Sequence, residues 1–215
     1  MKRSKSSRAW LEEHVSDAYV RAAQAHGYRS RAAFKLLELD ARERLFRPGQ
    51  LVVDLGAAPG SWTQVALAKV GPRGRVVGVD LLAIEPLAGA QFLLGDFTDD
   101  AVERDLVDAL GGAQADLVLS DMAPNISGVS AADQARSVGL AELALDFAVK
   151  HLKPEGVALV KVFQGSGFPQ LLQQARQTFP SVALRKPKAS RDRSPEQYLV
   201  ARGRRGGGGQ GVTKS

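Results

Sequence analysis

The feature that most constrains the fold is a series of short apolar runs that alternate with longer, helix-like segments. The runs are rich in valine and leucine, and they span residues 51–55, 75–80, 91–94, 115–120 and 156–162. The helix-like segments span residues 61–70, 131–151 and 167–178. Nearly continuous apolar strands separated by helices are typical of a parallel sheet covered by helices on both faces. The sequence therefore predicts an α/β fold with a mostly parallel sheet.

Further elements are expected before and after this alternating region. Two strand-like runs, residues 181–185 and 197–201, follow the last helix. Their connection has no room for a helix, so they should pair antiparallel at one edge of the sheet. Before the first strand, Ser30 is expected to cap a basic helix over residues 31–39.

Length and composition indicate one soluble domain. A chain of 215 residues can bury one substantial α/β core. We expect a basic helical extension over residues 1–47 that packs on the core, the α/β domain over 48–203, and a disordered glycine-rich tail over 204–215. Cysteine is absent, which excludes a disulfide scaffold, a thiolate metal site and a cysteine nucleophile. The chain shows no apolar signal region and no membrane-length apolar stretch, so we expect a cytoplasmic protein that does not bind membranes.

The net charge of +6 is unevenly distributed along the chain. Residues 1–47 hold 11 Lys/Arg and 6 Asp/Glu, residues 185–215 hold 9 and 2, and the residues between them hold 9 and 15. An acidic body with two basic ends suits a protein that binds a polyanion, because Lys and Arg displace counterions from phosphates. Two solvated tails that bind nothing would give the same pattern, so charge alone leaves both interpretations open.

A loop of small residues follows the first strand, over residues 54–62. Such a loop lets a ligand approach the backbone at the carboxyl end of the strand, beside a helix N-terminus. Gly56 and Gly60 are spaced wrongly for a dinucleotide-binding fingerprint, and Ser61 stands where a phosphate-binding P-loop has lysine. A loop without lysine or arginine suits a cofactor with a zwitterionic amino-acid tail and no phosphate.

Acidic residues follow the next two strands. Asp80 ends the second strand, where a carboxylate can accept hydrogen bonds from both hydroxyls of an adenosine ribose. Asp96 follows the third strand and could accept a bond from the adenine amino group. Each acid alone is more often a turn or cap residue. Their repeated placement at successive strand ends favours S-adenosyl-L-methionine as the cofactor.

A lysine lies within the fifth apolar run. Lys161 is flanked by valines on both sides, and lysine is rarely buried without a partner. A buried lysine loses its proton more readily than a free one and can act as a general base. The alternative is a lysine on an edge strand whose side chain extends to solvent. The fourth run ends in Ser120 and Asp121, so a carboxylate is expected nearby.

The sequence resembles the FtsJ-type ribosomal RNA 2′-O-ribose methyltransferases over residues 7–203. The matching stretches are residues 30–36, 54–62, 120–125, 160–165 and 190–198. One departure is Ser61, where the family usually has a second glycine. The resemblance implies a Rossmann-like, S-adenosylmethionine-dependent methyltransferase domain with a mostly parallel seven-stranded sheet, helices on both faces and an antiparallel C-terminal edge strand.

The resemblance also implies site residues and a substrate. The family's catalytic Lys-Asp-Lys-Glu tetrad corresponds to Lys35, Asp121, Lys161 and Glu196. Its cofactor contacts correspond to Gly60, Trp62, Asp80, Asp96 and Asp121, and no metal is expected. The implied activity is methylation of a ribose 2′-hydroxyl in RNA, on a uridine in the A loop of 23S ribosomal RNA in the large subunit, with the enzyme acting as a monomer.

Within that reaction, Lys161 is expected to be the general base and Asp121 to orient it. Lys35 would add positive charge and hold an RNA phosphate, and Glu196 would fix the lysines. Other candidate phosphate contacts are Arg29, Arg31, Lys186, Lys188, Arg191 and Arg193. A tRNA or mRNA-cap 2′-O-methyltransferase and a non-catalytic ribosome-assembly or RNA-binding factor remain as alternatives.

Overall fold

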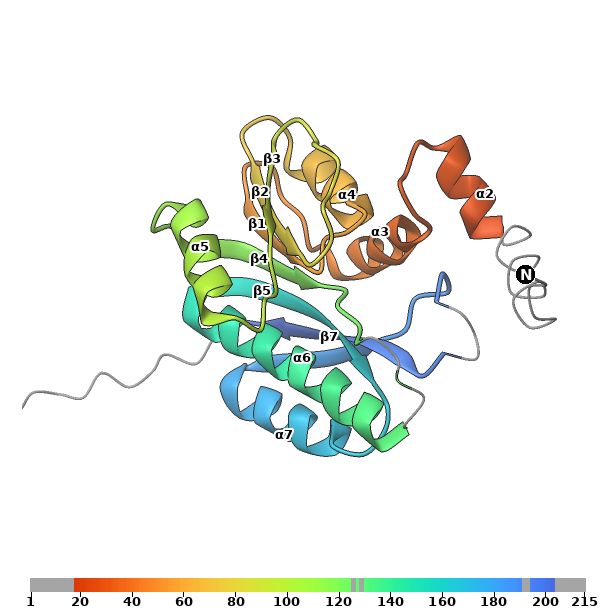
Figure 1. Ribbon diagram of the computed structural model, residues 1–215, viewed down its shortest axis with the longest axis vertical. Coiled ribbons are helices and arrows are strands. Elements are labelled where there is room, and N and C mark those ends of the chain that lie inside the picture. Colours follow the sequence, from red (N-terminus) through yellow and green to blue (C-terminus); the bar gives the residue numbers. More distant parts are fainter. Residues whose placement is uncertain (1–17, 125–126, 128–129, 191–193, 204–215) are drawn as a thin grey trace, which may run out of the picture.

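A computed structural model describes residues 18–124, 127, 130–190 and 194–203 of the chain. A seven-stranded sheet runs through its centre in the order β3-β2-β1-β4-β5-β7-β6 (Figure 1). The strands are β1 Leu51–Leu55, β2 Arg75–Asp80, β3 Ala90–Leu94, β4 Ala115–Ser120, β5 Leu152–Phe163, β6 Ser181–Arg185 and β7 Glu196–Arg202. Strands β1 to β5 pair in parallel, whereas β7 runs antiparallel to both β5 and β6. The predicted mostly parallel sheet with an antiparallel pair at one edge is confirmed; β6 is the outermost strand, and β7 lies between it and β5.

Helices cover both faces of this sheet, as predicted (Figure 1). They are α2 Ala18–Ala25, α3 Ala32–Glu43, α4 Ser61–Val70, α5 Asp100–Leu110, α6 Ser130–His151 and α7 Phe168–Thr178. Helices α3 and α4 pack against one face, and α5, α6 and α7 against the other. Among these helices, none is long and apolar enough to cross a membrane.

Side chains alternate between the two faces along each central strand. Val53 and Val118 belong to the apolar layer under α5, α6 and α7, and the neighbouring Val52 and Leu117 belong to the layer under α3 and α4. All four are fully buried. This alternation places every second residue of β4, β5 and β7 on the α3 side, and it determines which polar residues meet there.

Two helical segments differ from the expectation. The sequence pattern predicts no helix over residues 100–110, where the structure has α5. Asp99 caps this helix by accepting a hydrogen bond from the Ala101 N–H at 2.8 Å, and Gly111 ends it with a φ of 67°. Val102, Leu106 and Leu110 recur every four residues along it, so the missed signal was a short amphipathic helix with both caps.

Helix α3 is longer than the predicted residues 31–39, because it begins at Ala32 and ends at Glu43. The predicted cap position was wrong by one residue, since Arg31 holds it and donates no side-chain cap bond. The Ser30 hydroxyl still accepts a bond from the Ala32 N–H at 3.2 Å. Asp40 lets the helix continue beyond residue 39, because its carboxylate accepts bonds from two main-chain N–H groups beyond the helix end.

The predicted domain division remains untested. Helix α3, from the predicted extension over residues 1–47, packs into the same apolar layer as α4. The first 17 residues and the glycine-rich tail over 204–215 lie outside the described residues.

The anchoring of α3 can be tested with Leu36→Ala. Leu36 is fully buried on the inner face of α3, so its truncation should lower the free energy of unfolding by about 2–5 kcal/mol. Urea unfolding measures this difference. Leu94→Ala is a suitable control, because Leu94 is 68% exposed and its loss should cost less than about 0.5 kcal/mol. Equal effects of the two substitutions would contradict the packing of α3 into the core.

Candidate active site

The backbone of the loop after β1 passes very close to the segment that follows β4. Gly56 has a φ of 76°, and a Cβ atom there would lie 2.6 Å from the Met122 side chain. Gly60 has a φ of 101° and precedes the first residue of α4. Both positions therefore require glycine, and the loop brings the ends of β1 and β4 together at the N-terminus of a helix.

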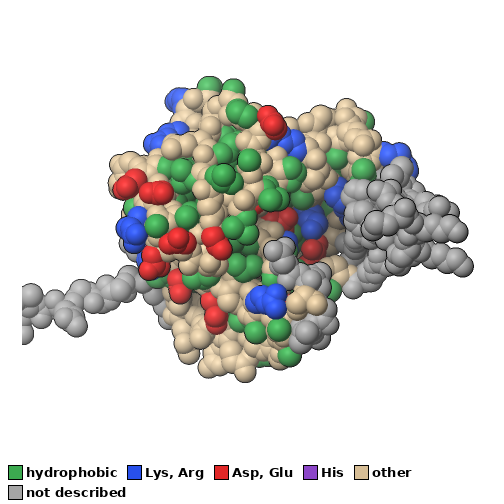
Figure 2. Space-filling view, viewed as in Figure 1, with side chains coloured by type: hydrophobic (Ala, Val, Ile, Leu, Met, Phe, Trp, Pro, Cys, Tyr) green, Lys and Arg blue, Asp and Glu red, His purple; other side chains and the backbone are tan. Residues whose placement is uncertain are grey.

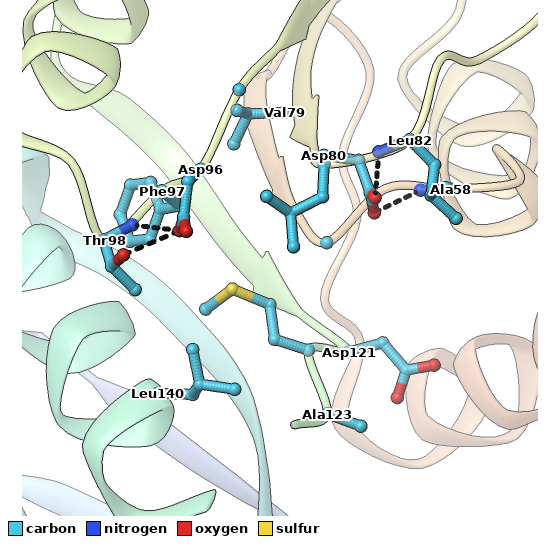
Figure 3. A pocket seen from close by; sticks show the side chains of 14 residues that line it. Ala58, Val79, Asp80, Leu82, Asp96, Phe97, Thr98, Asp121, Ala123 and Leu140 are labelled. Atoms are coloured by element: carbon cyan, nitrogen blue, oxygen red, sulfur yellow. Dashed lines mark hydrogen bonds between the residues drawn. The ribbon is translucent and has the colours of Figure 1, made fainter. Parts of the chain in front are cut away.

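A pocket of about 250 Å³ opens at this end of the sheet (Figure 3). Its wall combines the three predicted acids Asp80, Asp96 and Asp121 with apolar side chains that include Leu82 and Leu140. In Figure 3, Asp96 lies on one side of the pocket, and Asp80 and Asp121 lie on the other. The acids thus lie at the carboxyl ends of parallel strands. Open α/β sheets bind ligands at this edge of the sheet.

The main chain holds two of these acids rigidly. The two carboxylate oxygens of Asp80 accept bonds from the N–H groups of Ala58 and Leu82, each at 2.9 Å. Asp96 accepts bonds from the N–H and the hydroxyl of Thr98 (Figure 3), and these bonds lower the pKa of Asp96 below its ordinary value. A fixed, ionised carboxylate is a good acceptor for the hydroxyl or amino groups of a nucleoside.

Gly60 and Trp62 do not line the pocket. The Trp62 side chain is buried, and its indole N–H donates to the Ala32 carbonyl at 2.8 Å. Any cofactor contact at Trp62 would therefore come through its main chain at the start of α4. The pocket brings together Asp80, Asp96 and Asp121, three of the five predicted cofactor residues.

The four residues of the predicted tetrad, Lys35, Asp121, Lys161 and Glu196, meet on the α3 side of the sheet. Lys161 lies directly opposite Tyr198 across the β5–β7 pair, and Glu196 lies opposite Phe163. Ser120 pairs with Val160, so Asp121 follows β4 beside Lys161. Along a strand, every second side chain points to the same face of the sheet. Each of these strand residues is an even number of positions away from a core residue on the α3 side, so their side chains share that face.

Two ion pairs join the tetrad. The Lys161 ammonium lies 3.1 Å from the Oδ1 atom of Asp121 and donates to the Asp121 main-chain carbonyl at 2.6 Å. The Lys35 ammonium lies 2.6 Å from Oε1 of Glu196. The Lys161 side chain is 7% exposed, and its strand lies inside the sheet. The alternative of an edge-strand lysine that extends to solvent is therefore wrong.

A comparison with protein families agrees with this arrangement. Residues 28–204 match the model of the FtsJ-like methyltransferases. The chain belongs to the FtsJ-like methyltransferase family. The resemblance noted from the sequence is thereby confirmed, and the match covers every member of the tetrad.

Relatives of this FtsJ-like methyltransferase have similar lengths. The chain is 61% identical to the ribosomal RNA large subunit methyltransferase E of Azoarcus sp. (strain BH72), over 93% of this chain and 98% of that protein. It is 55% identical to the protein of the same name from Pseudomonas aeruginosa, over 96% and 100%. A crystal structure of a ribosomal RNA methyltransferase from Plasmodium falciparum is similar with a TM-score of 0.73 and 30% identity, over 82% of this chain and 98% of that one.

The one departure from the family motif has a structural explanation. Ser61 is buried, and its hydroxyl lies 2.8 Å from the Ser30 hydroxyl, within hydrogen-bond distance. A serine at this position therefore finds a partner on the segment before α3. The loop keeps the tight backbone conformation that Gly56 and Gly60 allow.

Sequence reasoning missed the role of Tyr198 in this FtsJ-like site. Tyr198 is fully buried between the two ion pairs, with its ring centroid 5.9 Å from the Lys35 ammonium. Its hydroxyl donates to Oδ1 of Asp121 at 2.7 Å. Burial, above all, raises the pKa of Tyr198 well above its ordinary value, so the hydroxyl stays a donor and helps to fix Asp121. The sequence could have indicated this role, because Tyr198 lies two residues after Glu196 and therefore on the same face of the strand.

Asp54 is a second residue that sequence reasoning passed over. It is fully buried at the end of β1, and its Oδ2 atom accepts a bond from the Thr63 hydroxyl at 2.7 Å. Burial, together with the charges of Asp121 and Asp80 and against the opposing hydrogen bonds of Thr63, raises the pKa of Asp54 to about 7. Three carboxyl groups thus act on one another at the ends of β1, β2 and β4. The charges of Asp80 and Asp121, which raise the pKa of Asp54, also favour a cation at this end of the sheet.

Asp54→Asn should change how stability depends on pH. The pKa of Asp54 is about 7 in the folded protein and 3.8 ordinarily, so between these values the folded state binds a proton that the unfolded chain has released. The contribution of the protonated Asp54 carboxyl to the free energy of unfolding is therefore fully present below about pH 4 and is lost as the pH rises towards 7. Relative to the wild type, the Asn variant should gain about 1.4 kcal/mol per pH unit between pH 5 and 6.5. Urea unfolding at several pH values measures this difference, and parallel profiles would contradict the assignment.

Proposed function

We propose that this protein transfers the methyl group of S-adenosylmethionine to a ribose 2′-hydroxyl of large-subunit ribosomal RNA. The observation that carries the proposal is the double role of Asp121, which lines the pocket and also contacts Lys161. A cofactor pocket and a candidate base are thereby joined through one residue. The expected nucleotide is a uridine in the A loop of 23S ribosomal RNA, and the names of the similar proteins from Azoarcus and Pseudomonas aeruginosa support the large subunit as the substrate.

The pocket suits the proposed cofactor on chemical grounds. Asp80 and Asp96 offer fixed acceptors for the ribose hydroxyls and the adenine amino group, and the apolar wall suits the base between them. When bound, S-adenosylmethionine supplies an electrophilic methyl group on a positively charged sulfur. The carboxyl groups of Asp80 and Asp121, which line the pocket, favour that positive charge. Gly60 and the main chain of Trp62 remain proposed contacts at the start of α4.

The reaction requires the ribose hydroxyl to lose its proton as the new carbon–oxygen bond forms. We assign this proton to the neutral amine of Lys161, which forms when the ammonium group first releases a proton to solvent. A neutral lysine amine keeps two N–H donors, enough for its two contacts with Asp121, and its lone pair is then directed elsewhere. Asp121 and Tyr198 hold the amine in place, so alignment of the reacting atoms supplies part of the acceleration. Lys35, held by Glu196, would bind an RNA phosphate beside the reacting ribose.

The RNA is proposed to bind across α3 and the β6–β7 connection. The two meet because Glu38 on α3 accepts bonds from the main-chain N–H groups of Lys188 and Ala189. Lys186 and Arg31 also bond to main-chain carbonyls there, and the candidate contacts Arg191 and Arg193 lie outside the described residues. In Figure 2, acidic side chains gather on the left, where α5 lies, whereas the recess beside α3 shows lysine or arginine side chains next to acidic ones. We expect the polyanion on the α3 side, where these cations lie. We expect a monomer that works in the cytoplasm.

The function is tested by incubating the protein with labelled S-adenosylmethionine and either intact large subunits or free ribosomal RNA. Mapping the modified nucleotide should place the label on a 2′-oxygen in the 23S A loop. Label on tRNA or on capped mRNA would replace the proposed substrate. Cofactor binding without transfer to any RNA would indicate a non-catalytic RNA-binding factor.

Lys161→Ala should abolish methyl transfer and leave the affinity for S-adenosylmethionine nearly unchanged. Lys161→Arg should not restore transfer, because a guanidinium keeps its proton at any working pH. Single-turnover assays measure the transfer, and calorimetry measures the binding. An arginine variant with most of the activity would show that Lys161 contributes only positive charge.

Charge reversal on the proposed RNA face should weaken RNA binding. Lys186→Glu and Lys188→Glu place carboxylates where phosphates are expected, so affinity should fall and the dependence of binding on salt should become shallower. Filter binding at several salt concentrations measures both quantities. Arg104→Glu, on α5 at the acidic side of the molecule, is the matched control. Unchanged affinity in the two lysine variants would contradict the placement of the RNA.

A further inference from the structure

One arginine side chain joins three segments around the cofactor pocket. Arg29 lies in the turn between α2 and α3. Its Nη1 atom donates to the main-chain carbonyls of Pro59 at 3.0 Å and Glu85 at 2.8 Å, and its Nη2 atom donates to the carbonyl of Pro86 at 3.2 Å. Pro59 belongs to the loop after β1, and residues 85–86 belong to the segment that follows β2. One guanidinium therefore connects these two loops to the turn before α3.

The turn that carries Arg29 is itself fixed to α4. The Arg29 main-chain N–H donates to Oε1 of Gln64 at 2.8 Å, and the Gln64 amide donates to the Gly27 carbonyl at 3.0 Å. Gly60 leaves room for the guanidinium, because a Cβ atom there would lie 2.7 Å from Nη1 of Arg29 and 3.3 Å from Ile84. Glycine is therefore required at residue 60 for two reasons: its backbone conformation, and the space that the Arg29 guanidinium occupies.

The same two loops are also joined inside the pocket. Asp80 accepts bonds from the N–H groups of Ala58 and Leu82, which precede Pro59 and Glu85 in the two loops. The pocket wall includes both Ala58 and Leu82. Asp80 thus fixes the loops at the pocket and Arg29 fixes them at a second point, so the separation of the loops depends on both side chains.

We propose that Arg29 is a positioning residue for the cofactor pocket, and the proposal rests on the proposed function. Its guanidinium holds the two loops at the separation that lets Asp80 and the apolar wall receive the nucleoside. This role replaces the phosphate contact that the sequence suggested for Arg29. A lysine cannot substitute, because the planar guanidinium presents several donors in fixed directions and an ammonium is a compact point charge.

The test uses the full chain with Arg29→Ala and Arg29→Lys. Both variants should raise the Kd and the KM for S-adenosylmethionine about tenfold, as expected for the loss of bonds from a charged donor. The kcat at saturating cofactor, the RNA affinity and the salt dependence of RNA binding should stay near the wild-type values. Arg104→Ala, at an exposed position on α5 away from the proposed RNA face, is the control and should leave all five quantities unchanged.

Chemical rescue distinguishes positioning from a general loss of folding. Guanidinium ion at low millimolar concentration should restore much of the cofactor affinity of Arg29→Ala, and should do nothing for the wild type or for Arg104→Ala. A variant that lost cofactor affinity without rescue, together with a lower unfolding temperature and weaker RNA binding, would overturn the proposal in favour of a merely structural role.

A phosphate contact would give the opposite pattern. In that case RNA affinity would fall, the slope of its logarithm against the logarithm of salt concentration would lessen by about one, and the Kd for S-adenosylmethionine would not change. This outcome, or variants with unchanged binding of both ligands, would overturn the proposal. A wild-type protein that does not bind S-adenosylmethionine would overturn the proposed function itself, and the positioning role with it.

Discussion

The site depends on the contact between Lys161 and Asp121, where a buried lysine is held by a carboxylate and a main-chain carbonyl of the neighbouring strand. A charge in the interior is costly unless it is paired and hydrogen-bonded, so this contact constrains everything around it. Tyr198 completes the set by donating to the same carboxylate oxygen. Removing the Asp121 carboxylate would leave the buried Lys161 ammonium with a main-chain carbonyl in place of its ion pair. Moving Lys161 and Asp121 apart would therefore be unfavourable, and the fold holds the two groups in contact.

The sheet makes this contact through strand register and alternation. Lys161 on β5 lies between Asp121, which follows β4, and Tyr198 on β7. All three side chains point to the α3 side, while their sequence neighbours Val160, Val162 and Leu199 fill the core on the other side. Helix α3 then brings Lys35 to Glu196. Antiparallel insertion of β7 beside β5 is essential, because it carries C-terminal residues back to the centre of the sheet.

Electrostatics divide the site into two parts. At the pocket, Asp80 and Asp121 create a negative field that suits a positively charged cofactor and that raises the pKa of the buried Asp54. On the α3 side, Lys35 and Lys161 each lie against a carboxylate, so their amino groups are held in fixed positions. Asp121 belongs to both parts. Methyl transfer from a cationic donor to an alcohol needs both parts of the site, because one stabilises positive charge and the other can take up a proton.

The sequence by itself determined the parallel sheet, most of its strands and the positions of the acids at strand ends, because hydrophobic periodicity and strand-end residues are local signals. It missed α5, whose few apolar residues form a weak pattern, and it placed the start of α3 one residue early. Only the tertiary structure decided that Lys161 is buried, that Tyr198 fixes Asp121 and that the Arg29 guanidinium bonds to the cofactor loops. Those facts arise from contacts between residues distant in sequence, such as residues 121 and 198 or 29 and 85. Strand order and helix packing bring such residues together, and no local pattern in the chain records them.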